Sequence, residues 1–170
     1  MHLLYVSLLA LLAAQQQYKE GEYQLYSEVT KQYAAGDYAK TLAALDTWYA
    51  KIPNTDYANN RRILYVQTYF AAQQPAKAID AATDLLQGDP AKTFPAPADR
   101  LRILYMVVTA IKQLPEPTPA QQSTAREAAK QLTAMDQPPQ GLSPADWQRA
   151  RNDLHIAATS ADLYIALLPV

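Results

Sequence analysis

The tetrapeptide Arg-Ile-Leu-Tyr occupies residues 62–65 and occurs again at residues 102–105, forty residues further along the chain. Each copy opens an apolar stretch without proline, and an alanine-rich segment follows each of them. Self-similarity at such a period is typical of helical repeats, in which every unit is a pair of antiparallel helices. The two copies therefore predict an all-α chain built from helical hairpins.

Proline and glycine mark where these helices begin and end. The chain has twelve prolines, none before Pro53, and only four glycines. Because proline disrupts a helix interior, the stretches without it are where helices can run. We expect about seven helices, at about residues 22–35, 38–51, 57–73, 75–87, 98–113, 119–135 and 145–168.

Individual residues predict the ends of some of these helices. Gly36 can adopt the left-handed conformation that ends a helix, and Asp37 can cap the next one. Thr118 and Gln121 have the spacing of a capping box, with Pro119 in the first turn between them. The segment from Pro90 to Pro97 is expected to be a proline-rich loop.

Length and composition limit the classes of function. The chain has 170 residues, 49% of them hydrophobic, a net charge of −1 and no cysteine. This length suits one domain with or without a leader. The charge balance provides no basic surface for nucleic acid, and the lack of cysteine excludes disulfides and thiolate chemistry.

The first fourteen residues are expected to be a secretory signal. Residues 3–14 are apolar except for Ser7, carry no charge and are too short to span a bilayer as a helix. Such a signal predicts export to the periplasm or cell envelope. The alternative is a buried or interfacial first helix, with the protein then remaining in the cytoplasm.

The hairpins resemble those of the tetratricopeptide-repeat (TPR) family. Gly36-Asp37-Tyr38 resembles the turn inside such a unit, and Pro53 closes the unit at the expected distance. In the next unit Ala78 stands at the small crossing position, and Pro90 closes it. The resemblance implies a domain over residues 22–168, a short right-handed solenoid with units at about 22–53, 59–90 and 99–135 and a half unit at 145–168. The overall pattern is also similar to TPR proteins of bacterial envelopes that begin with a signal peptide.

The same resemblance implies a concave groove lined by the first helix of each unit. The candidate partner-binding residues are Tyr23, Tyr26, Tyr33, Asn60, Gln67, Phe70 and Arg100. Tyrosine offers contact area and a hydroxyl at a low cost in side-chain entropy. The alternative for each residue is packing in the core, above all for Tyr33 and Phe70.

No residue pattern indicates catalysis, a cofactor or a metal. The two histidines, His2 and His155, do not have ligand spacing. Four scattered glycines cannot form a phosphate-binding loop, and basic residues do not alternate with aromatic ones as in nucleic-acid-binding proteins. We expect a scaffold for a protein or peptide partner rather than an enzyme. The alternative is a receptor that binds a peptide or small ligand in a tyrosine-lined groove.

The last expected helix, residues 145–168, is apolar nearly all round after Asp162. Repeat arrays normally end in a helix with a polar outer face. We therefore expect either further repeats in a longer array or docking of this helix on a partner or a second copy. The alternative is that it packs only against the preceding pair.

The signal hypothesis predicts that the native mature protein begins near Gln15, because the small-residue site at Ala14 would be cleaved. N-terminal sequencing of protein purified from its native cells measures this directly. An intact Met1 on the native, soluble protein would contradict the hypothesis.

Overall fold

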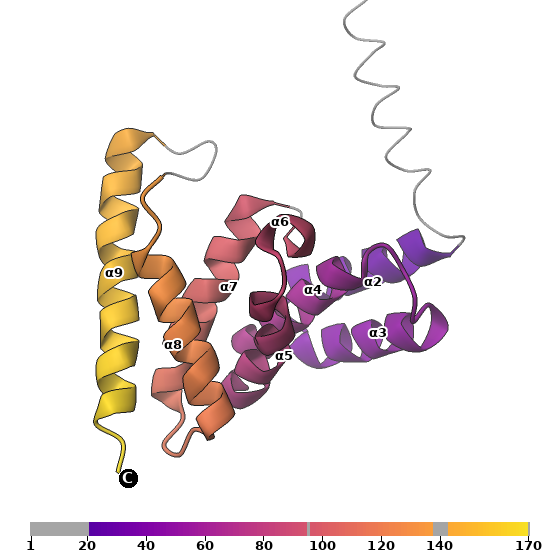
Figure 1. The fold of residues 1–170 in the computed structure, drawn as a ribbon. Helices are drawn as coiled ribbons and strands as arrows, with labels where there is room; N and C mark the ends of the chain where they lie inside the picture. The colour runs from indigo at the N-terminus through magenta and orange to yellow at the C-terminus, as the bar shows by residue number, and fades with distance from the viewer. Residues whose placement is uncertain (1–20, 95, 138–142, 170) are drawn as a thin grey trace, which may run out of the picture. The chain divides into compact units, whose positions relative to one another are not determined.

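The computed structural model describes residues 21–94, 96–137 and 143–169 (Figure 1). In these ranges every regular element is helical, which confirms the expected all-α class. The chain divides between Thr55 and Asp56 into two compact units, which we call unit 1 and unit 2. The expected secretory signal at residues 1–14 lies outside the described residues.

Unit 1 is an antiparallel hairpin of α2 (Glu22–Ala34) and α3 (Tyr38–Lys51). Val29, Leu45 and Trp48 are fully buried and form its apolar centre. The carboxylate of Glu22 is buried as well, and it accepts hydrogen bonds from Trp48 Nε1 at 2.9 Å and from the Thr55 hydroxyl. Since a buried carboxylate is costly without donors, these bonds hold the start of α2 against the end of α3.

The turn between α2 and α3 is the one that the sequence predicts. Gly36 has a φ of 72°, the left-handed conformation that glycine adopts without steric cost. The Asp37 carboxylate caps α3 by accepting from the Lys40 amide at 3.1 Å, and it lies 2.6 Å from Lys40 Nζ. The hydrogen bonds from the side chain and the amide of Lys40 lower the pKa of Asp37.

Unit 2 contains two hairpins and a long final helix (Figure 1). Its elements are α4 (Ala58–Ala71), α5 (Pro75–Gln87), α6 (Pro90–Thr93), α7 (Pro97–Ala110), the 3₁₀ turn η1 (Ile111–Gln113), α8 (Pro119–Thr133) and α9 (Pro144–Ala166). α7 packs against both helices of the α4–α5 hairpin, and α9 packs against both helices of the α7–α8 hairpin. Each first helix therefore covers the pair before it, which is how a hairpin buries the apolar face it cannot cover alone.

The observed helix ends differ from the predicted ones by at most three residues. The largest difference is at the end of α7, which is predicted at Gln113 and observed at Ala110. The expected loop from Pro90 to Pro97 contains α6, a single helical turn that the sequence analysis missed. Asp89 caps this turn by accepting from the Ala91 amide at 3.1 Å, and Pro90 occupies its first position. A proline at that position favours a helix start, because its missing amide would have had no partner there.

The turns of the first two hairpins repeat bond for bond. In the first turn, the amide of Gly36 donates to Tyr33 and that of Asp37 donates to Gln32. In the turn between α4 and α5, the amides of Gln73 and Gln74 donate to the carbonyls three and five residues before them, Phe70 and Tyr69. Gln73 has a φ of 55°, the same left-handed region as Gly36. Both helices therefore end in the same type of motif, although the second lacks a glycine.

Buried positions also recur along the chain. Those of the first and second hairpins are 37 residues apart, and those on the second helices of the second and third hairpins are 47 residues apart. The buried pairs of the first two hairpins are Val29 and Val66, Thr41 and Ala78, Leu45 and Ala82, and Trp48 and Leu85. The buried residues of α8 that continue the last three pairs are Ala125, Ala129 and Leu132. The position nearest the start of each second helix is small, which lets the two helix axes of a hairpin approach closely.

Polar contacts hold the second hairpin of unit 2 on the first. Thr118 and Gln121 form the expected capping box at the start of α8, with amide-to-side-chain distances of 3.0 and 3.2 Å. The Gln121 amide group also donates to Asp80 on α5 at 2.9 Å. Gln121 thus caps the start of α8 and also fixes the position of α8 along α5.

The buried alanines of α8 are expected to tolerate no larger side chain. Ala128→Leu adds three carbons at a site with no exposed surface, so it should lower the free energy of unfolding by about 1–3 kcal/mol. Urea unfolding followed by circular dichroism measures the change. Ala120→Leu, at an exposed position of the same helix, is the matched control and should change it by less than about 0.5 kcal/mol. Equal effects of the two substitutions would contradict close packing at Ala128.

Candidate functional site

The three candidate tyrosines of unit 1 lie on α2 and differ in exposure. Tyr23 is 49% exposed. Tyr26 is half-buried and meets the indole of Trp48 edge-on, with ring centroids 6.0 Å apart. Tyr33 is half-buried beside Tyr38, with the two ring centroids 5.8 Å apart. Tyr23 therefore presents the largest surface of the three, whereas Tyr26 and Tyr33 contribute to packing.

The four candidates of unit 2 lie on α4 and α7, and three of them have structural contacts. Gln67 is only 8% exposed, and Phe70 packs against the hydrophobic core. Arg100 donates from Nη2 to Gln131 on α8 at 3.0 Å, and Asn60 is half-buried. Whether any of these residues binds a partner stays a prediction.

The structure indicates another set of tyrosines, which the sequence analysis did not select as a site. Tyr65 on α4 and Tyr105 on α7 are the last residues of the two Arg-Ile-Leu-Tyr copies, on helices that pack against each other. Tyr105 is 44% exposed, and Tyr65 is half-buried in a stacked pair with Tyr69, centroids 6.0 Å apart. Lys77 Nζ lies 5.7 Å from the Tyr69 ring. We call Tyr65, Tyr69 and Tyr105 the tyrosine surface. The repeated tetrapeptide is the sequence feature that indicates Tyr65 and Tyr105.

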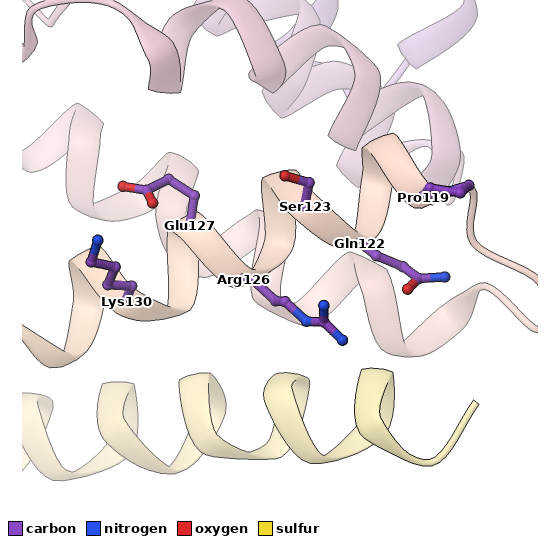
Figure 2. Close-up of a pocket in the computed structure, with 6 residues that line it drawn as sticks. All are labelled: Pro119, Gln122, Ser123, Arg126, Glu127 and Lys130. Atoms are coloured by element: carbon purple, nitrogen blue, oxygen red, sulfur yellow. The ribbon is translucent and has the colours of Figure 1, made fainter. Parts of the chain in front are cut away.

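α8 presents a polar face to solvent (Figure 2). The shallow depression on it is lined by six residues of this one helix, Pro119, Gln122, Ser123, Arg126, Glu127 and Lys130. Glu127 accepts a hydrogen bond from Gln131 at 2.9 Å, and Gln122 donates to the Pro117 carbonyl at 3.0 Å. The depression therefore has no opposing wall from a second helix.

One side of α9 carries exposed aliphatic side chains. Ile156, Leu163 and Leu167 are 68%, 58% and 75% exposed. The Leu167 amide donates to the Leu163 carbonyl at 3.1 Å, so the helical turn continues to this residue. We call these three residues, with Thr159 and Ser160 between them, the outer face of α9.

In the part of the chain that the structure describes, ionisable side chains form pairs such as Asp37 with Lys40 and Asp99 with Arg102. No group of three or more His, Asp or Glu residues there could hold a metal ion. No helix of that part is long and apolar enough to cross a membrane. His155 is half-buried on α9 beside the outer face, among hydroxyl and aliphatic side chains.

The helices and surfaces together define an all-α protein of helical hairpins, which pack on one another within unit 2 and carry exposed aromatic and aliphatic side chains. Comparison of the chain with protein-family models, curated proteins and solved structures finds no match. The class of this protein therefore rests on its own repeat and packing.

The different environments of the α2 tyrosines lead to a prediction. Tyr26→Ala removes the ring that packs on Trp48 and should lower the free energy of unfolding by about 1–3 kcal/mol. Tyr23→Ala, at the exposed position three residues earlier, is the control and should have an effect under about 0.5 kcal/mol. Urea unfolding monitored by tryptophan fluorescence measures both, and a larger effect of Tyr23→Ala would contradict the assignment.

Proposed function

We propose that this chain is a non-catalytic protein-interaction scaffold of the TPR-like class, and that it binds a protein or peptide segment on the tyrosine surface of unit 2. The observation that carries the proposal is the repeated, solvent-accessible tyrosine of the first helices, Tyr65 and Tyr105. Side chains on the first helices of stacked hairpins are the ones that line the binding side of such repeats.

The chemistry of this surface supports a polypeptide partner. An exposed tyrosine ring offers a large apolar area with only two side-chain torsions to fix, and its hydroxyl can bond a backbone group. Arg102, one turn before Tyr105, forms an ion pair with Asp99 at 3.3 Å, and Lys77 lies over the ring of Tyr69. Aromatic rings bordered by charges of both signs resemble the composition of interaction hot spots and their polar rims.

The proposal of a scaffold rather than an enzyme follows from how the polar side chains are used. Gln121, Arg100 and Glu22 all bond to neighbouring helices. Their hydrogen-bonding capacity is directed into the fold, where it fixes the positions of helices. Binding on an exposed helix surface requires only that this surface be rigid, and such bonds provide rigidity.

The test compares Tyr105→Ala with a matched control, Tyr49→Ala. Tyr49 belongs to unit 1 and is 58% exposed. Immobilised wild-type chain and both variants are incubated with an extract of the native cells, and bound proteins are quantified by mass spectrometry. Truncation of a hot-spot tyrosine costs about 2 kcal/mol, so Tyr105→Ala should reduce the bound partner roughly thirtyfold. Tyr49→Ala should retain it.

Two results would contradict the proposal. One is the recovery of the same proteins in the same amounts by all three chains. The other is the absence of any protein above the level on empty resin. Circular dichroism of the three chains checks that the substitutions leave the helical fold in place, as expected for exposed side chains.

A further inference from the structure

The outer face of α9 has the spacing of a helix-pairing seam. Ile156, Ser160, Leu163 and Leu167 follow one another at intervals of four, three and four residues. This is the alternation by which two helices pack along their lengths. The opposite side of α9 has a similar spacing and is buried in unit 2; its residues are Trp147, Leu154, Ala158, Ala161 and Ile165. One seam of α9 is therefore packed inside unit 2, and the second seam is exposed to solvent.

The depression on the outer face has the shape that receives a helix side chain. Its lining includes Ile156, Thr159, Ser160 and Leu163, which stand at positions i, i+3, i+4 and i+7 of α9. Four residues in this arrangement form the hole into which a knob from a facing helix inserts. The two central residues are small, so a leucine can enter between the larger side chains at either end. The surface thus fits another helix.

We propose that the helix which occupies this surface is α9 of a second copy of the chain, packed antiparallel on the first. In the register that places Leu163 opposite Ser160 of the second copy, Ile156 lies opposite Leu167 of that copy. The twofold symmetry repeats both contacts. Every exposed aliphatic side chain of the seam then meets either another aliphatic side chain or the small residue of a hole, as a self-complementary interface requires.

Charge favours the antiparallel direction. One heptad before Ile156 and Ser160, the seam continues through Arg149 and Asp153. A parallel pair would place each of these charges opposite its own copy, and facing like charges disfavour association. In the antiparallel register Asp153 and Arg149 both fall outside the paired stretch from Ile156 to Leu167, so no charged residue of α9 lies on the seam within that stretch.

The area of the seam sets the expected affinity of the dimer. Three exposed aliphatic side chains offer on the order of 100 Å² each, or roughly 300 Å² per copy, against about 800 Å² per partner in a standard stable complex. The dimer should therefore be weak and reversible. Lys112 Nζ lies 3.4 Å from the hydroxyl of Ser160, a seam residue, so in this register one lysine of each copy lies beside the symmetry axis. Added salt screens their repulsion and should tighten the dimer.

Sedimentation equilibrium of the full chain over about 5–500 µM tests the association, a range that suits an interface of this small size. We expect the average mass to rise from monomer toward dimer with concentration and to rise further with added NaCl. Leu163→Asp should weaken association at least tenfold, because it places a charge in the hole of each copy. Gln148→Asp adds the same charge to the same helix outside the paired stretch and should leave association unchanged.

Spin-label distances test the direction of packing. The chain has no cysteine, so Asn152→Cys carries the only label. In the antiparallel dimer two labels at this position are about 30 Å apart, whereas a parallel dimer would place them about 10 Å apart. A short distance, a monomer throughout the concentration range, or a dimer unaffected by Leu163→Asp would each overturn the proposal. The tyrosine surface is a different set of residues, so none of these results decides whether it binds a partner.

Discussion

The architecture depends on how closely the two helices of each hairpin can approach. Thr41, Ala78 and Ala125 stand at the same place near the start of the second helix in three successive hairpins, and all three are almost fully inaccessible to solvent. A small side chain there removes the steric limit on the distance between the helix axes. The larger residue seven positions later, Trp48, Leu85 or Leu132, then fills the space where the helices diverge. Close packing of this kind makes the exposed helix surfaces rigid.

Polar side chains add specificity to this apolar packing. Between α7 and α8, Arg100 donates to Gln131, and Gln131 in turn donates to Glu127 on its own helix. At the far end of unit 2 the Tyr164 hydroxyl donates to the Leu114 carbonyl, which joins α9 to the segment after η1. Apolar contacts alone would allow one helix to slide along another by a turn. A hydrogen bond between fixed points would be lost in such a shift, and a buried group without its partner is costly.

Most of the fold could be predicted because local chemistry determines it. Pro75, Pro119 and Pro144 each occupy a first-turn position, and Gly36 ends α2, so the sequence marks the helix limits directly. The turn at Gln73 carries no such mark. There the hydrogen bonds to Tyr69 and Phe70 and the packing of the hairpin hold a glutamine in the left-handed conformation. That information lies in tertiary contacts, which helical periodicity does not reveal.

The candidate site was less predictable, because an aromatic residue in a helical stripe has the same periodicity whether it packs or binds. Phe70 contributes to the core, and Tyr26 packs on Trp48, whereas Tyr105 of the repeated tetrapeptide is exposed. Only the position of the neighbouring helices distinguishes these cases. The same reason explains why α9 looked apolar nearly all round in the sequence: its two apolar rows lie on opposite sides, and only the structure shows which one is covered.

The exposed row of α9 and the tyrosine surface become related if the chain is a dimer. Two copies joined through α9 present two tyrosine surfaces related by a twofold axis. A partner with two matching segments, or a partner that is itself a dimer, then binds the second site intramolecularly, at an effective concentration set by the geometry of the pair. A weak interface suffices for this purpose, because each binding event strengthens the other. Two modest surfaces, neither large enough for a tight complex alone, can in this way produce a selective assembly.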